Sequence, residues 1–88
     1  MSTEQPWFLY LLRCADGKVY TGITPNVEKR LAEHRAGKGA NFTRGRRRVE
    51  LIYTERHPSK SAACVREREV KRWSRRKKLA LIGTVKRT

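Results

Sequence analysis

The strongest constraint on the fold is a short polar turn between two β-rich segments near the N-terminus. The segment Trp7–Cys14 reads WFLYLLRC, and residues 18–23 read KVYTGI, with Ala15, Asp16 and Gly17 between them. Aromatic and β-branched side chains favour strands, and Asp-Gly between two such runs is a strong hairpin signal. The sequence therefore predicts a β-hairpin on which the remaining elements must pack.

The length of the turn decides which side chains share a face of the hairpin. A two-residue loop would place Tyr10 and Tyr20 on opposite faces, whereas a three-residue loop with Gly17 in the left-handed conformation would pair Tyr10 with Gly22. A slip of one residue moves every side chain to the other face. Only the three-residue register gathers an apolar second face, made of Trp7, Leu9, Leu11, Val19 and Ile23. We therefore predict the three-residue turn, with both tyrosines on one face.

The segment after the hairpin predicts a helix from Pro25 to about Ala36, with Thr24 as its N-cap. At about 100° per residue, the apolar stripe of this helix includes Arg30 and His34. An arginine and a histidine within an apolar stripe require an explanation beyond packing.

A basic loop follows at residues 37–48, and a third strand is predicted at 49–54. In that strand Val49, Leu51 and Tyr53 are expected on one face, because strand side chains alternate.

Two further helices complete the expected fold. Pro58 and Ser59 open a helix that runs to about Trp73, and Ser74 caps a short third helix over 75–82 that ends at Gly83. The expected fold class is α+β, with a three-stranded antiparallel sheet and three helices in the order β-β-α-β-α-α. We expect one domain over residues 1–88, with its core at about 7–83.

The charge of the chain indicates a polyanionic partner. Lys and Arg number 22 against 8 Asp and Glu, which gives a formal net charge of +14. Nucleic acid is the expected partner, since a membrane-binding protein usually needs an amphipathic helix or lipid anchor.

The sequence has neither a membrane-spanning stretch nor a signal-peptide pattern, so we expect a cytoplasmic protein. Cys14 and Cys64 lack the spacing of a zinc or redox pair and are expected to be reduced.

Several side chains have the chemistry that phosphodiester hydrolysis requires. The reaction needs an activated water, neutralisation of the phosphoryl oxygens and help for the leaving oxygen. An arginine matches phosphate geometry, and one carboxylate can hold a divalent ion. Helical periodicity leaves Glu67 and Glu69 as alternatives for that carboxylate.

The order of these residues resembles the GIY-YIG nuclease superfamily, in particular its small stand-alone bacterial members of the YhbQ-like kind. The resemblance covers roughly residues 7–83. The first triplet is Phe-Leu-Tyr rather than Gly-Ile-Tyr, and the second is Tyr-Thr-Gly rather than Tyr-Ile-Gly. The matching motifs are Phe8-Leu9-Tyr10, Tyr20-Thr21-Gly22, Arg30-Leu31-x-x-His34, Gly37-Lys38-Gly39-Ala40 and Glu67-x-x-Val70-Lys71.

The resemblance implies a metal-dependent endonuclease and gives each residue a role. Glu67, rather than Glu69, would hold the divalent ion, Mg²⁺ or Mn²⁺. Arg30 would stabilise the phosphate, and His34 would lie beside a tyrosine. One of Tyr10 and Tyr20 would act as the general base, and which one stays open.

The expected substrate is DNA rather than RNA, in repair or recombination, bound by a monomer. The alternative is a nucleic-acid-binding module without catalysis. The hairpin, the basic loop and the C-terminal helices supply the expected nucleic-acid contacts, which are Lys18, Lys38, Asn41, Arg44, Arg46, Arg47, Lys71 and Arg75.

Overall fold

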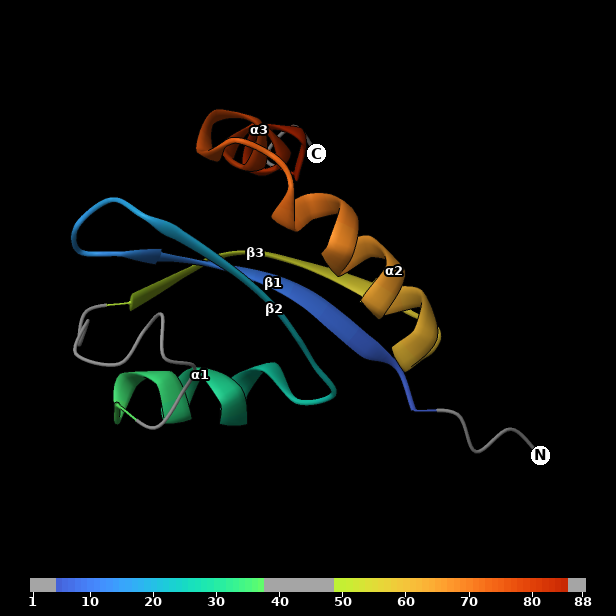
Figure 1. The fold of residues 1–88 in the computed structure, drawn as a ribbon. Coiled ribbons are helices and arrows are strands. Elements are labelled where there is room, and N and C mark those ends of the chain that lie inside the picture. Colours follow the sequence, from blue (N-terminus) through green and yellow to red (C-terminus); the bar gives the residue numbers. More distant parts are fainter. Residues whose placement is uncertain (1–4, 38–48, 86–88) are drawn as a thin grey trace.

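A three-stranded antiparallel sheet lies between one helix on one face and two helices on the other (Figure 1). The computed structural model describes residues 5–37 and 49–85, with side chains described as far as residue 82. The strand order is β2-β1-β3. The α+β class and the element order are confirmed. The elements are β1 (Trp7–Cys14), β2 (Val19–Thr24), α1 (Val27–Arg35), β3 (Val49–His57), α2 (Lys60–Lys71) and α3 (Arg75–Val85).

The hairpin adopts the predicted three-residue turn. Tyr10 pairs with Gly22, and Leu12 pairs with Tyr20. The Cys14 amide donates to the Lys18 carbonyl oxygen at 2.8 Å, and Gly17 has a φ of 88°, which favours glycine. Both tyrosines therefore lie on one face of the sheet, as predicted.

The central strand β1 is buried on both faces, so the sheet has a core on each side. On the α2 side, Leu9 and Leu11 pack with Val19 and Val70. On the α1 side, Tyr10, Leu12, Cys14 and Val49 form a second buried cluster, against which Leu31 of α1 packs. The predicted apolar face is thus confirmed, and the face that carries the tyrosines is buried as well.

The predicted alternation of β3 is wrong because the strand contains a bulge. Leu11 pairs with Tyr53 and Leu12 pairs with Leu51, so Ile52 is the extra residue. A bulge reverses the facing of the residues beyond it. Val49 and Leu51 therefore pack on the α1 side, whereas Tyr53 packs with Ile52 on the α2 side. The strand also continues to His57, beyond the predicted end at residue 54.

Helix α1 begins two residues later than predicted, because Asn26 rather than Thr24 is its N-cap. The Asn26 side chain accepts a hydrogen bond from the Lys29 amide at 3.0 Å. Thr24 remains in β2, and its hydroxyl accepts from the Asn26 amide at 3.1 Å. Pro25 therefore lies in a turn between strand and helix instead of in the first helical turn.

The caps of the other two helices are as predicted, but their C-terminal ends differ from the predictions by two or three residues. Ser59 caps α2, accepting from the Ala62 amide at 3.2 Å, but α2 ends at Lys71 rather than Trp73. The hydroxyl oxygen of Ser74 accepts from the Lys77 amide at 3.2 Å, as expected of a cap. Helix α3 continues to Val85, past the predicted end.

A half-buried carboxylate fixes α2 against β3. Glu55 accepts hydrogen bonds from Arg66 Nε and His57 Nε2, both at 2.9 Å, and from the Tyr53 hydroxyl at 2.7 Å. Burial opposes the ionisation of Glu55, but these hydrogen bonds outweigh it and keep the pKa of Glu55 below its usual value. Arg66 of α2 donates hydrogen bonds to both Glu55 and Glu69. These contacts fix the rotation of α2 about its own axis.

Replacing Glu55 with glutamine should therefore destabilise the fold by about 2 kcal/mol, because it leaves the half-buried Arg66 with only the exposed Glu69 as a counter-charge. The matched control is Glu50→Gln on the same strand, whose ion pair with Arg13 is exposed. That change should cost less than about 0.5 kcal/mol. Urea unfolding of both variants measures the difference, and equal losses would show that Glu55 does not anchor α2.

Candidate active site

Three aromatic rings meet on the α1 side of the sheet. Tyr10 is only 2% exposed, and its hydroxyl oxygen lies 3.0 Å from Nε2 of the fully buried His34. The ring centroid of Tyr20 lies 6.2 Å from that of Tyr10 and 5.2 Å from that of His34. The predicted stripe of α1 thus faces the tyrosines, which explains a histidine on its buried side.

Gly22 makes room for the Tyr10 ring. A Cβ atom at position 22 would lie 2.5 Å from the Tyr10 hydroxyl oxygen and 2.9 Å from Cε2 of Tyr20. Real Cβ contacts are not that short, so no other residue fits without moving the two rings. The glycine of the second triplet is therefore required by packing, independently of any chemistry.

Tyr10 and His34 are both uncharged near neutral pH. Burial raises the pKa of Tyr10 to about 12, although the neighbouring Arg30 guanidinium opposes the shift. Burial, and then the positive charge of Arg30, lowers the pKa of His34. A protonated phenol beside a neutral imidazole can donate to Nε2, which leaves the lone pairs of the Tyr10 oxygen for other donors.

Arg30 supplies a permanent positive charge next to this pair. Its Nη1 donates to Glu33 Oε1 at 2.9 Å, and the guanidinium also interacts with the Tyr10 hydroxyl. The hydrogen bond to Glu33 raises the pKa of Arg30 above its ordinary value. About a third of the Arg30 side chain remains exposed, so it can still contact a ligand.

Glu33 is a site residue that the sequence reasoning missed. Its carboxylate orients Arg30, and the hydrogen bond from Arg30 lowers the pKa of Glu33. The signal was available, because residues three apart on a helix are neighbours and opposite charges at that spacing attract.

Glu67 lies on α2, on the opposite side of the sheet from α1. Its Oε2 lies 3.3 Å from Lys71 Nζ, one helical turn away. The side chain of Glu67 is 21% exposed, against 55% for Glu69. The two carboxylates thus differ in exposure, a difference that helical periodicity alone could not show.

The orientation of α2 turns Glu67 toward the β2 side of the sheet. Ala63 and Val70 are the buried residues of the helix and mark the line that faces the sheet. At about 100° per residue, Arg66 and Glu67 fall on opposite flanks of that line. Arg66 reaches Glu55 on β3, one edge strand, so Glu67 is directed toward β2, the edge strand that carries Tyr20.

One carboxylate suits a hydrated magnesium ion better than a metal held by several side chains. Within the described residues there is no group of three or more His, Cys, Asp and Glu side chains that could hold an ion. Mg²⁺ keeps several water ligands and is often bound through one or two carboxylates. Glu67 therefore fits as a single protein ligand, provided that its ion pair with Lys71 opens.

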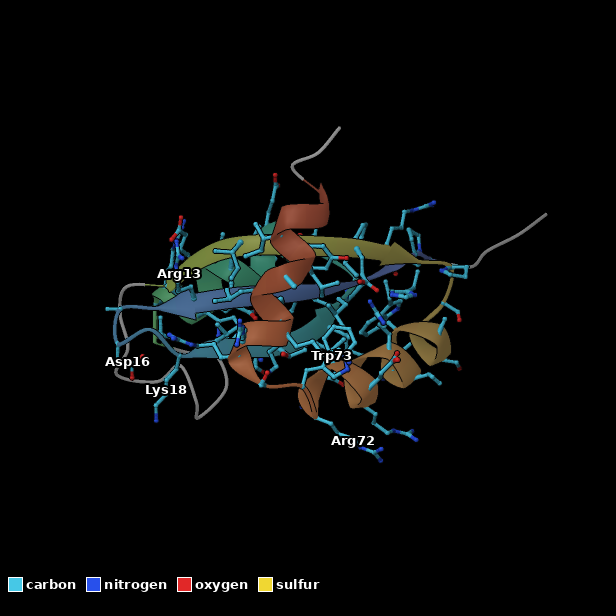
Figure 2. All side chains as sticks on the ribbon, turned by 90° about the horizontal axis from the view of Figure 1, so that it is seen from above. Arg13, Asp16, Lys18, Arg72 and Trp73 are labelled. Carbon is cyan, nitrogen blue, oxygen red and sulfur yellow. The ribbon has the colours of Figure 1, made fainter. Side chains whose placement is uncertain are left out.

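The expected nucleic-acid contacts are only partly within the described residues. Lys18 is exposed at the hairpin turn, where Figure 2 shows it beside Asp16. Arg75 Nη1 donates to the Gly17 carbonyl oxygen at 2.9 Å, so this arginine docks α3 on the turn. Lys71 pairs with Glu67. The remaining candidates, Lys38, Asn41, Arg44, Arg46 and Arg47, lie outside the described residues.

The buried His34 should make the fold sensitive to mild acid. Its pKa is lower in the folded chain than the usual value of about 6.5, so the unfolded chain binds the proton first. The free energy of unfolding should therefore fall as the pH drops below about 6.5, by up to about 1.4 kcal/mol per pH unit. Urea unfolding between neutral and mildly acidic pH measures this slope.

The His34→Gln variant should lose this part of the pH dependence. The control is His57→Gln, since His57 is the other histidine of the chain and leaves the titration of His34 in place. An unchanged slope in His34→Gln would contradict the assignment.

Comparisons with known proteins agree with this geometry. The GIY-YIG catalytic domain model matches residues 6–80. A UPF0213 protein from Natronomonas pharaonis is 59% identical over 76 residues, which are 86% of this chain and 89% of that protein. A UPF0213 protein from Staphylococcus haemolyticus is 51% identical over 75 residues, 85% of this chain and 92% of that protein.

Two solved structures are also similar to the chain. The solution NMR structure of the UPF0213 protein BH0048 from Bacillus halodurans has a TM-score of 0.58 at 46% identity, covering 90% of this chain and 84% of that one. The solution NMR structure of EF2693 from E. faecalis has a TM-score of 0.65 at 35% identity, covering 100% and 95%. None of the described helices is long and apolar enough to cross a bilayer. The family match and the relatives together show that the chain belongs to the GIY-YIG family.

Proposed function

We propose that this protein is a metal-dependent endonuclease that hydrolyses phosphodiester bonds in nucleic acid, with DNA as the preferred substrate. The proposal depends above all on one observation, the packing of Tyr10, Tyr20, His34 and Arg30 around one point on the α1 side of the sheet. These side chains come from three different elements. Their convergence supplies a cation, a partly exposed phenol and buried partners that hold both in place.

Arg30 would bind the phosphoryl oxygens of the scissile phosphate. A guanidinium matches phosphate geometry and keeps its charge at any working pH. Glu33 holds one side of the fork at 2.9 Å, which limits the rotamers of Arg30 before substrate arrives. The arginine would then stabilise the additional negative charge that forms on the phosphoryl oxygens when water attacks.

Tyr20, rather than Tyr10, would take the proton from the attacking water. Tyr20 is partly exposed, whereas Tyr10 is buried. The pKa of Tyr10, raised to about 12, also makes its phenolate costly to form. Tyr10 and His34 would instead hold the Tyr20 ring in place by packing against it. In this step Tyr20, as its phenolate, accepts the proton when a water O–H bond breaks, and the water oxygen bonds to phosphorus. The bond from phosphorus to the leaving oxygen breaks, and the leaving oxygen takes a proton from solvent.

Glu67 would hold a divalent ion, Mg²⁺ or Mn²⁺, at the β2 edge. When bound there, the ion would neutralise charge on the phosphate and at the leaving oxygen. The half-buried position of Glu67 and its direction toward the strand of Tyr20 support this assignment. Lys71, which now pairs with the carboxylate, is exposed enough to release it and contact a phosphate.

The same ion pair is what favours the second candidate, a nucleic-acid-binding module without catalysis. In that case Lys71 would stay paired with Glu67, and the positive charge of the chain would provide binding alone. Dependence of cleavage on metal and on Glu67 separates the two functions.

The Glu67→Gln variant should lose cleavage by at least about a hundredfold, because the ion supplies several kcal/mol of transition-state stabilisation. Its affinity for DNA should change little. The control is Glu69→Gln, which removes the same charge from an exposed position on the same helix. The assay compares single-stranded, duplex, branched and damaged DNA with RNA at low salt, with Mg²⁺, Mn²⁺ or EDTA. Branched and damaged DNA test the proposed role in repair or recombination.

Equal cleavage by Glu67→Gln and Glu69→Gln would exclude the metal role of Glu67. Binding to every substrate without products, in all three metal conditions, would favour the non-catalytic module.

Two conservative tyrosine variants should separate chemistry from packing. Tyr20→Phe keeps the ring but removes the proton acceptor, so cleavage should fall by about 10²–10⁴-fold with little change in stability. Tyr10→Phe removes the hydrogen-bond partner of buried His34, so the free energy of unfolding should fall by about 1–3 kcal/mol. Single-turnover cleavage and urea unfolding of both variants provide the measurements. The reverse pattern would assign the proton transfer to Tyr10.

A further inference from the structure

A shallow cleft lies along α2, away from the tyrosine cluster. It is lined by Val65, Arg68, Glu69, Arg72 and Trp73. None of these residues has a role in the reaction proposed above. In Figure 2, Arg72 extends outward from the molecule, whereas Trp73 packs against the buried cluster on the α2 side of the sheet. The cleft therefore opens to solvent along the exposed side of the helix.

Arg68 and Arg72 place two positive charges side by side in this cleft. Both are exposed, and residues four apart on a helix lie about 5–6 Å apart at Cβ. Like charges at this spacing destabilise a helix. Neither arginine forms an ion pair with another residue in the described ranges 5–37 and 49–82. A bound anion would remove this repulsion.

The carboxylate in the cleft does not offset the two arginines. Glu69 accepts from Arg66 Nη1 at 3.1 Å, so its charge is already paired. The Trp73 ring has Lys77 Nζ at 4.5 Å and Arg66 Cζ at 5.1 Å from its centroid. An aromatic ring attracts cations to its faces, so Trp73 keeps the positive charges of Arg66 and Lys77 beside the cleft.

Val65 adds an apolar contact beside these cations. It is 65% exposed and is the large hydrophobic residue that the described part of the chain leaves in solvent. One exposed valine offers too little apolar area to insert into a membrane. Cations next to a small apolar surface match the sugar–phosphate backbone of a nucleic acid, which presents phosphates and sugars in alternation.

We propose that this cleft binds the backbone of a second nucleic-acid segment, separate from the one at the tyrosines. The sheet and the width of a helix, about 10 Å, lie between the cleft and the α1 side. A strand bound against the tyrosines therefore reaches the cleft only by passing around the edge of the sheet. A substrate with two arms or a second strand would fill both sites.

The first test is an NMR titration of the ¹⁵N-labelled protein with a single-stranded tetranucleotide, at low salt and with EDTA present. Two groups of backbone amides should shift, one around Arg68 and Arg72 and one around Tyr20 and Arg30. In the Arg68→Gln/Arg72→Gln variant the first group should stay in place while the second still shifts. Glutamine has a helix propensity close to that of arginine, so the variant should fold.

The second test is the salt dependence of binding to a longer single strand. Loss of two phosphate contacts should reduce the slope of log K against log salt by about 1.4, or about 0.7 per contact, and weaken binding on the order of tenfold. The control is Arg56→Gln/Lys60→Gln, which removes two exposed charges outside both sites. Its slope should stay near that of the wild type.

Equal slopes in the two double variants, or no amide shifts around Arg68 and Arg72, would overturn the proposal. Equal weakening of binding to anionic lipid vesicles and to nucleic acid would also overturn it, by showing a general anion surface. Because no arm requires cleavage, failure of the second site is distinguishable from failure of the proposed nuclease activity.

Discussion

The close approach of Tyr10 to Gly22 is the contact on which the site depends. The Tyr10 ring crosses β2 at the one position where no Cβ stands in its way. From there its hydroxyl reaches His34, and this buried hydrogen bond joins α1 to the sheet. Tyr20 packs against both rings. A larger residue at position 22 would move Tyr10 away from His34, and α1 would lose the contact that positions Arg30.

A second polar network, on the other side of the sheet, joins α2 to the sheet as Tyr10 joins α1. Glu55 accepts hydrogen bonds from three donors, one of which is Arg66 of α2. The contact with Arg66 sets the rotation of α2 and therefore the direction of Glu67. Two half-buried networks thus place a cation on one side of the sheet and a carboxylate on the other. The proposed reaction requires both to act at the edge strand β2, between the two faces.

Much of this arrangement follows from local sequence rules. The three-residue turn with Gly17 fixed the register, because only that register produces an apolar face, and the register places both tyrosines together. The anomalous Arg30 and His34 of the apolar stripe both contact Tyr10 under α1. These inferences succeed because strand alternation and helical periodicity are properties of the backbone alone.

The features that sequence reasoning missed depend on contacts between distant segments. The bulge at Ile52 moves Tyr53 to the α2 side, and no local pattern marks it. Asn26 rather than Thr24 is the N-cap of α1, because Thr24 belongs to β2 and its hydroxyl bonds to the Asn26 backbone in the turn. The different exposure of Glu67 and Glu69 depends on the ion pair between Arg66 and Glu55, whose partners are eleven residues apart in the chain.

In the proposed reaction, Glu67 and Tyr20 act at one metal site across the β2 edge. The most direct test is paramagnetic broadening of the ¹⁵N-labelled protein by Mn²⁺ at substoichiometric concentration. We expect joint broadening of amides around Glu67 and around Tyr20, which disappears in Glu67→Gln and persists in Glu69→Gln. Broadening around Glu67 that spares Tyr20, or broadening that survives Glu67→Gln, would contradict it.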